Sequence, residues 1–139
     1  RGIEKTNFLT QIIKHKQIEP ELIICSPAIR TRQTANQIIQ MLNWNKTQII
    51  FDELLYSGNY QNYLNALYSI DDQINSVMIV GHNPSISEAA YELCRQIEMM
   101  RTSQICHLEF ETSKWSEIPN SNIKSWFTIN PKSSESAHE

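Results

Sequence analysis

The sequence is poor in glycine and cysteine, and both shortages argue against whole classes of function. Only three of the 139 residues are glycine. They form neither a GxGxxG nor a GxxxxGK[ST] motif, which argues against the glycine-rich loops of nucleotide-binding domains. The three cysteines, Cys25, Cys94 and Cys106, are odd in number and include no CxxC pair. We therefore expect reduced, mostly buried thiols in a cytosolic protein, with neither a disulfide framework nor a zinc site.

Long apolar runs and an excess of positive charge are also missing. No apolar run approaches the roughly 18 residues that a membrane-spanning helix needs, and no signal-peptide pattern precedes the first predicted helix. The formal net charge is -3 at pH 7, which argues against a broad basic surface for nucleic acid. The sequence thus predicts a cytoplasmic protein that binds neither membranes nor nucleic acid, and any anion site in it must be local.

The apolar residues follow a pattern that alternates between helices and strands. Short continuous runs such as "ELIIC" and "SVMIV" are typical of strands covered on both faces, whereas spacings of three and four are typical of helices. The last two strands flank a short polar loop and should form an antiparallel hairpin at a sheet edge. The predicted helices are residues 3–16, 27–42, 60–70 and 85–97, and the predicted strands are residues 21–25, 47–51, 76–80, 105–110 and 123–129.

This alternation predicts a three-layer α/β fold with a mostly parallel central sheet, helices on both faces and an antiparallel edge. The length suits one domain, which we place at residues 1–131, followed by a polar C-terminal tail at residues 132–139. Domains of this kind usually open with a strand, yet the first predicted element is a helix. We therefore expect that a first strand is missing from residues 1–139, because a sheet without it would expose a wide apolar edge.

Two strand-to-helix connections, "LIICSPAIRT" and "VMIVGHNPSIS", have the same construction. Each ends an apolar strand, continues with a small polar residue that caps helices well, Ser26 or Asn83, and then has proline at the favoured first helical position. Both should direct backbone N–H groups and the positive end of a helix dipole to the carboxyl edge of the sheet. Ligands bind at that edge in open α/β folds.

The first connection carries Arg30 within one turn of the helix start, and the second places His82 in the turn itself. An arginine there opposes the helix dipole by about a few tenths of a kcal/mol, so its position favours a function. Its planar fork of donors can join backbone amides around a phosphate group. Taken singly, Arg30 is explained as a solvated surface group and His82 as a residue that caps the turn. If the strands that precede them lie side by side, however, both side chains reach one site, and together they indicate phosphate chemistry. Arg32 should point to a different face and be solvated.

Acidic residues follow the strand at residues 47–51. Asp52 and Glu53 should lie at its carboxyl end, where a general acid for a leaving group could stand. Glu53 is the better candidate, because the following "LLY" should pack inward and turn it toward the sheet edge. The alternative is an acidic turn on the surface. His15, His107 and His138 have no sequence neighbours that suggest catalysis.

Several segments resemble the histidine phosphatase (phosphoglycerate mutase-like) superfamily. "SPAIRTRQTA" is similar to its SPxxRAxQTA segment, and "VGHNP" is similar to its second-histidine motif. "RGIEK", "FDELLY", "HLEFETSKWSEI" and "INPK" resemble further segments in the same order, so the likeness covers nearly the whole chain. Several ordered motifs are more specific than any one of them. The nearest likeness is to the small branch of SixA-type phosphohistidine phosphatases.

In that superfamily the histidine of an RHG or RHA motif attacks the phosphoryl group and becomes phosphohistidine, while two arginines and a second histidine hold the transferring group. The resemblance implies that Arg30 is the second pocket arginine and His82 the second histidine. It also implies that Glu53 occupies the position of the proton donor in many members. The implied activity is that of a phosphatase without metal or other cofactor, acting on a histidine-phosphorylated protein or a small phosphate ester.

One part of the superfamily pattern is absent. No RHG or RHA motif occurs in residues 1–139, so the nucleophilic histidine and the first pocket arginine are missing and this chain alone should be inactive. Two interpretations stay open. Either these residues belong to a segment outside the sequence, which we favour, or the protein is a non-catalytic module that binds phosphate or phosphoproteins.

Overall fold

The central element of the fold is a parallel sheet of three strands in the order β2-β1-β3. The computed structural model describes residues 2–101, 104–130 and 136–137. β1 pairs with both of its neighbours in register, so that Cys25 lies beside Phe51 and Val80. Because the three strands end at the same level, the residues that follow them share one edge of the sheet. The strands are β1 (Leu22–Cys25), β2 (Gln48–Phe51) and β3 (Val77–Val80).

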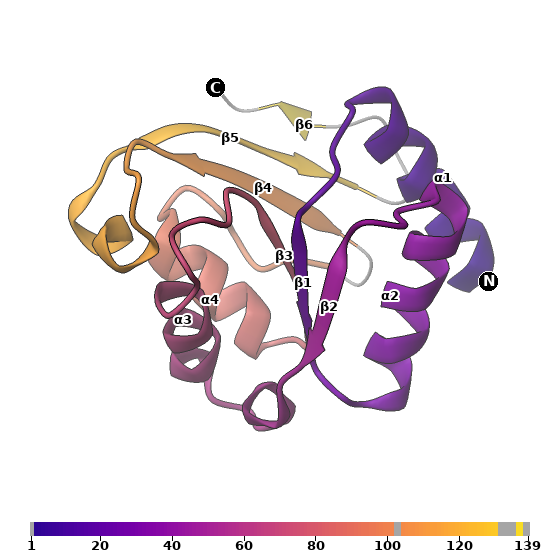
Figure 1. The fold of residues 1–139 in the computed structure, drawn as a ribbon, viewed down its shortest axis with the longest axis horizontal. Helices are drawn as coiled ribbons and strands as arrows, with labels where there is room; N and C mark the ends of the chain where they lie inside the picture. Colours follow the sequence, from indigo (N-terminus) through magenta and orange to yellow (C-terminus); the bar gives the residue numbers. More distant parts are fainter. Residues whose placement is uncertain (1, 102–103, 131–135, 138–139) are drawn as a thin grey trace.

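Helices cover both faces of this sheet, which confirms the predicted three-layer α/β arrangement. α1 and α2 lie on one face, and α3 and α4 lie on the other (Figure 1). Two short 3-10 helices, η1 (Glu53–Tyr56) and η2 (Trp115–Asn120), lie in the connections. The four α-helices are α1 (Gly2–His15), α2 (Ile29–Leu42), α3 (Tyr60–Tyr68) and α4 (Ser85–Leu93).

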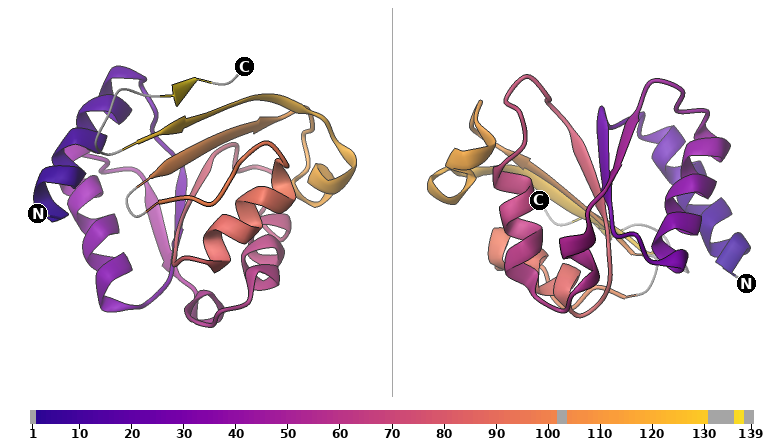
Figure 2. Two further views of the ribbon diagram at one scale, coloured as in Figure 1. Left: turned by 180° about the vertical axis from the view of Figure 1, so that it is seen from behind. Right: turned by 60° about the horizontal axis from the view of Figure 1, so that its bottom comes forward.

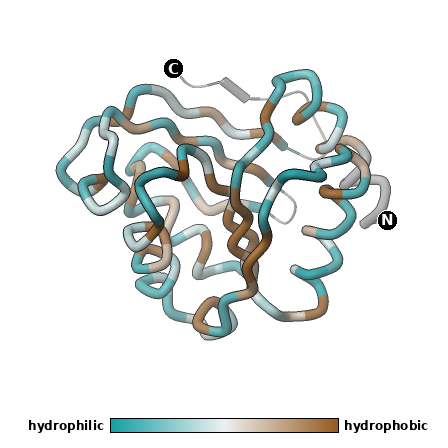
Figure 3. The backbone as a smooth tube through the Cα atoms, in the orientation of Figure 1, coloured by the Kyte–Doolittle hydropathy of each residue, from teal (hydrophilic) through white to brown (hydrophobic). Residues whose placement is uncertain are grey.

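Every residue of β1 is buried, because this strand is central and covered on both faces. Ile23 and Cys25 belong to the cluster that includes buried residues of α1 and α2. Leu22 and Ile24 belong to the cluster on the opposite face. Their alternation follows from the two-residue period of a strand. In Figure 3 the hydrophobic colour is strong where the strands of the parallel sheet cross the middle of the molecule.

The C-terminal strands form a separate antiparallel sheet in the order β4-β5-β6. The predicted hairpin of β4 (Ile105–Phe110) and β5 (Ile123–Ile129) is confirmed, and β6 (Ser136–Ala137), within the predicted tail, adds two residues to β5. The hairpin differs from the prediction in one respect: it is not hydrogen-bonded to the edge of the parallel sheet. Figure 2 shows the hairpin crossing beside that sheet.

The neighbouring edges of the two sheets lack a strand partner in the described ranges. β3 pairs with β1 alone and β4 pairs with β5 alone. Met78 and Val80 of β3 and Ile105 of β4 nevertheless pack against the same core cluster. All four residues of β3 are only half-buried, in contrast with β1. The outer edge of β3 is therefore an apolar strand edge that is incompletely covered.

Of the two helices that follow the matched connections, α2 begins two residues later than predicted, whereas α4 begins at Ser85 as predicted. α2 begins at Ile29 after Ala28, and α4 begins at Ser85 after Pro84, and neither start has a side-chain cap. The prediction that Ser26 and Asn83 cap these helices is therefore wrong. The Ser26 hydroxyl instead contacts Nε2 of His82, and the Asn83 side-chain nitrogen donates to the Met100 carbonyl, so both side chains have a partner far along the chain. None of the helices in the described residues is long and apolar enough to cross a membrane.

Candidate functional site

Ser26 and His82 join the two matched connections at the carboxyl edge of the sheet. The backbone N–H of Ser26 donates to the carbonyl of Val80 at 2.9 Å, which extends the β1–β3 ladder by one residue. The Ser26 Oγ lies 2.7 Å from Nε2 of His82. Ser26 is fully buried, while His82 is half-buried. The strands that precede Arg30 and His82, β1 and β3, are therefore neighbours, as the prediction of a shared site requires.

Tyr63 of α3 holds the backbone of His82. Its hydroxyl accepts a hydrogen bond from the His82 N–H at 3.0 Å and donates one to the Leu55 carbonyl at 3.1 Å. Burial raises the pKa of the Tyr63 phenol, so the proton that bonds Leu55 is retained. A Cβ added at Gly81 would overlap the Tyr63 ring, so glycine permits this close approach. Tyr63 thus links the turn of His82 to η1, which carries Glu53.

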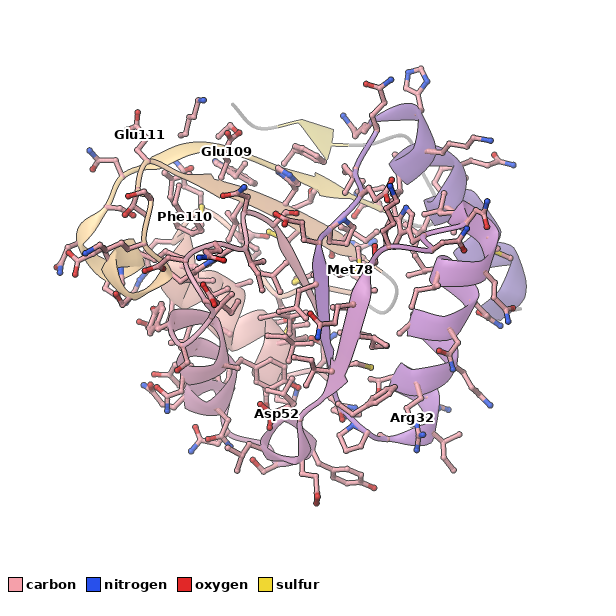
Figure 4. All side chains as sticks on the ribbon, viewed as in Figure 1. Arg32, Asp52, Met78, Glu109, Phe110 and Glu111 are labelled. Carbon is pink, nitrogen blue, oxygen red and sulfur yellow. The ribbon has the colours of Figure 1, made fainter. Side chains whose placement is uncertain are left out.

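Arg30 lies in the first turn of α2 with its side chain exposed. Within the described part of the chain, no side chain pairs with its guanidinium group. Arg32 is also exposed, and its guanidinium lies 4.9 Å from the centre of the Phe51 ring. Figure 4 shows Arg32 and Asp52 at the same end of the sheet. Of the two cations at this helix start, Arg30 is therefore the one without a side-chain partner among the residues that the structure describes.

Asp52 and Glu53 have different places at the end of β2. Asp52 Oδ1 accepts from the Leu54 N–H at 3.0 Å and so caps η1, whereas the Glu53 side chain is exposed. The expectation that "LLY" packs inward is correct only for Leu55, which is fully buried, and wrong for Leu54 and Tyr56. A 3-10 helix has three residues per turn, so one side chain in three faces the core. Glu53 remains a candidate proton donor because it follows the carboxyl end of β2, but the inward packing of its neighbours no longer supports this role.

Other groups of possible chemical interest lie outside this edge or are inert. Burial raises the pKa of the Cys25 thiol and raises that of Cys106 to about 12, so neither forms a thiolate near neutral pH. His107 of β4 stacks on Phe127 at 4.6 Å, and burial lowers its pKa. In residues 2–101, 104–130 and 136–137, no cluster of three His, Cys, Asp or Glu side chains is placed to hold a metal. His138 lies outside the described residues.

Sequence reasoning missed two residues of this site. Local preference indicates a helix cap for Ser26, and the spacing of apolar residues gives Tyr63 no more than a place in the predicted helix at residues 60–70. The contacts of both with His82 join residues 56 and 19 positions apart. The available signals were weak: a small polar residue directly after a buried strand, and a hydroxyl-bearing aromatic on a core face, which usually finds a partner when buried.

Comparison with known sequences supports the resemblance that the motifs indicate. No protein-family profile matches the chain. The chain is 26% identical over 117 residues to the phosphohistidine phosphatase SixA of Escherichia coli K12, and the match covers 81% of this chain and 71% of that protein. It is 23% identical to an uncharacterised protein of Mycobacterium leprae over 113 residues, covering 81% and 67% of the two chains.

Comparison with solved structures gives the same answer for the fold. A SixA-type protein from Agrobacterium tumefaciens matches with a TM-score of 0.72 and 20% identity, covering 90% of this chain and 78% of that one. A SixA protein histidine phosphatase complexed with tungstate matches with a TM-score of 0.71 and 22% identity, covering 90% and 79%. A SixA-type protein from Nakamurella multipartitia matches with a TM-score of 0.71, 18% identity, and 90% and 80% coverage. In sequence and in fold, the chain thus resembles the SixA-type phosphohistidine phosphatases of the histidine phosphatase superfamily.

Proposed function

We propose that this chain carries the phosphate-binding part of a phosphatase that acts through a phosphohistidine intermediate, with phosphohistidine in a protein as its substrate. The observation that carries the proposal is the 2.7 Å contact between Ser26 Oγ and His82 Nε2. This contact brings the two matched connections, and with them Arg30 and His82, to one edge of the sheet. The SixA name of the E. coli relative and the tungstate in a solved SixA structure support a tetrahedral oxyanion as the ligand.

The chemistry needs charge neutralisation and positioning more than covalent help from these residues. An imidazole nitrogen of the nucleophile attacks phosphorus, the bond to the substrate's leaving atom breaks, and the leaving group takes the electron pair. Water then attacks the phosphohistidine, the P–N bond breaks, and phosphate leaves. Arg30 supplies a bidentate donor for two phosphoryl oxygens, and the first N–H groups of α2 lie beside it. Glu53 is the proposed proton donor for an ester leaving group.

His82 is proposed to donate to a phosphoryl oxygen from Nδ1. In this proposal the Ser26 hydroxyl, whose oxygen accepts from the Ala28 N–H at 3.4 Å, donates its own proton to Nε2 of His82. With Nε2 as an acceptor, the neutral ring carries its proton on Nδ1. No described group bonds that nitrogen. The Ser26 hydroxyl would therefore set the tautomer in which His82 is a donor at the site.

No RHG or RHA motif occurs in residues 1–139, so the proposed scheme takes its nucleophile from a segment that these residues do not include. β3 and β4 each have one edge without a strand partner among the described residues, and the residues of β3 are only half-buried. A further strand could form hydrogen bonds with the free backbone groups of such an edge. A strand there would end beside Gly81 and His82 if it ran parallel to β3. We therefore propose that the RHG or RHA histidine and the first pocket arginine are delivered by a strand at this position.

Two measurements test the proposal. Residues 1–139 should bind inorganic phosphate or tungstate by calorimetry. Arg30→Ala and His82→Ala should each weaken binding by about tenfold or more, which corresponds to about 1.4 kcal/mol. Arg32→Ala is the matched control, because its guanidinium lies over Phe51 on the same helix start and should leave the Kd unchanged. Equal weakening by Arg32→Ala and Arg30→Ala would contradict a localised site.

The second measurement uses the complete natural gene product. It should form an acid-labile phosphoenzyme with a histidine-phosphorylated protein and release phosphate, and His82→Ala should lower turnover by orders of magnitude. Binding that depends on Arg30 and His82 without any turnover would instead establish the non-catalytic phosphoprotein-binding module. The absence of an RHG or RHA motif from residues 1–139 is the observation that keeps this second function open.

A further inference from the structure

Large apolar side chains are exposed mainly beside the candidate phosphate site. The described residues expose eight such side chains, and five of them come from the start of α2, the end of β2 and η1. Single exposed apolar residues are ordinary on a protein surface, but a cluster of them at one place marks an interaction surface. We define the apolar rim as Ile29, Phe51, Leu54 and Tyr56.

Three of the four members of the rim are next to a candidate site residue. Ile29 directly precedes Arg30, and Leu54 directly follows Glu53. The Tyr56 ring lies 6.1 Å from the His82 ring. Figure 3 shows the hydrophobic colour of η1 and of the start of α2 at the same end of the molecule. The rim therefore lies at the same edge of the sheet as the proposed phosphate site, and Tyr56 links it to His82.

The exposure of Leu54 and Tyr56 is built into the backbone of η1. The Leu54 carbonyl accepts from Asn62 Nδ2 at 3.0 Å and from Ser57 Oγ at 3.1 Å, and the Leu55 carbonyl accepts from the Tyr63 hydroxyl. These bonds and the Asp52 cap fix the segment, so that Leu55 is buried while its two neighbours face outward. A fixed apolar surface loses little conformational entropy when a partner covers it.

We propose that the apolar rim docks the apolar residues that flank the phosphorylated side chain of a protein substrate. The inference rests on the proposed function. Charge complementarity supports this occupant, since the phosphate would meet Arg30 while its flanks meet the rim, and Arg32 lies over Phe51 within it. Tyrosine and arginine beside apolar residues are typical of protein interfaces. A small ester would fill the phosphate site and leave the rim uncovered.

The test compares three probes with residues 1–139 by calorimetry: inorganic phosphate, and two peptides that carry a hydrolysis-resistant triazole analogue of phosphohistidine. One peptide has leucine and isoleucine flanks, and the other has serine and glycine flanks. The wild-type chain should bind the apolar-flanked peptide at least tenfold more tightly than the polar-flanked one. Leu54→Gln with Ile29→Gln should remove this preference and leave the Kd for inorganic phosphate within twofold.

Met41→Gln is the matched control. Met41 is exposed on α2, about 18 Å along the helix axis from Ile29 at 1.5 Å per residue, and should keep the full preference. Equal binding of the two peptides by the wild type, or an unchanged preference in the rim variant, would overturn the inference while phosphate binding stands. If Arg30→Ala leaves the Kd for inorganic phosphate unchanged, the result contradicts the proposed phosphate site. If the wild-type chain binds none of the three probes, the result contradicts both the phosphate site and the docking role of the rim.

Discussion

The two strand-to-helix connections share a sequence pattern, yet they hold their candidate site residues in opposite ways. His82 is fixed at its backbone by Tyr63 and at its ring by Ser26. Arg30 sits on a helix start that is anchored by Thr31, whose hydroxyl donates to the Ser26 and Ala28 carbonyls, but its own side chain is exposed. The edge thus combines a positioned imidazole with an uncommitted guanidinium. The difference shows that a repeated local motif does not imply repeated tertiary support.

The largest expected effect comes from Gly81→Ala, which acts on the tightly held connection. Gly81 does not have a positive φ, so alanine is tolerated by the backbone and the added Cβ acts only by overlapping the Tyr63 ring. Displacing this ring should lower the free energy of unfolding by about 1–3 kcal/mol, the usual cost of overpacking. Urea denaturation followed by circular dichroism measures the loss.

Gly58→Ala is the control for that substitution. The nearest atom to a Cβ at Gly58 is the Ser85 Oγ at 3.9 Å, which is an ordinary contact. Its free energy of unfolding should stay within about 0.5 kcal/mol of the wild type, as for most surface changes. Similar losses for both alanine variants would show that Tyr63 does not constrain the turn of His82.

The second effect comes from Tyr63→Phe, which keeps the ring and removes the hydroxyl. The Leu55 carbonyl and the His82 N–H each lose a partner, at a cost of about 1–3 kcal/mol. Amide hydrogen exchange of His82 should accelerate, because its N–H is no longer bonded. Tyr68→Phe is the control, since the Tyr68 hydroxyl has no hydrogen-bond partner among the described residues. Unchanged His82 exchange in Tyr63→Phe would contradict the positioning role.

The sequence predicts most of the fold because that information is local. Continuous apolar runs locate β1 and β3, because a strand covered on both faces is apolar at every position. Spacings of three and four locate the helices, because a helix covered on one face has apolar residues once per turn. Both strands of the hairpin have the predicted bounds, Ile105–Phe110 and Ile123–Ile129. The separation of the hairpin from the parallel sheet could not be predicted, because strand composition does not specify which edges pair.

The candidate site is predicted only as far as its residues obey local rules. The placement of Arg30 and His82 beyond the ends of neighbouring strands follows from the parallel pairing of β1 with β3. The role of Ser26 does not, because capping preferences describe a residue and its next few neighbours, while its partner lies 56 positions away. The exposure of Leu54 follows from a 3-10 turn that the pattern "LLY" does not reveal.

The third effect comes from Ser26→Ala, which releases the ring of His82 but not its backbone. Loss of the Oγ–Nε2 bond should lower the free energy of unfolding by about 1 kcal/mol, less than Tyr63→Phe because only one bond to His82 is lost. Nitrogen-15 shifts should show His82 changing from a single tautomer with a proton on Nδ1 to a mixture. Ser69→Ala, which removes an exposed hydroxyl bonded to the Asn65 carbonyl, should leave these shifts unchanged. A mixed tautomer in the wild type would contradict the proposed donor role of Ser26.

The smallest effect on stability, and the sharpest test of the comparison, comes from Arg30→Gln. An exposed cation in the first turn of α2 opposes the helix dipole, so its removal should leave the free energy of unfolding unchanged or raise it by about a few tenths of a kcal/mol. The same variant should bind inorganic phosphate about tenfold more weakly. Glu88, in the first turn of α4, already suits its dipole, so Glu88→Gln should be slightly destabilising and leave phosphate binding unchanged. A residue that lowers stability slightly and is needed for phosphate binding is retained for function rather than for folding. A lower free energy of unfolding in Arg30→Gln would instead show that this guanidinium group supports the fold.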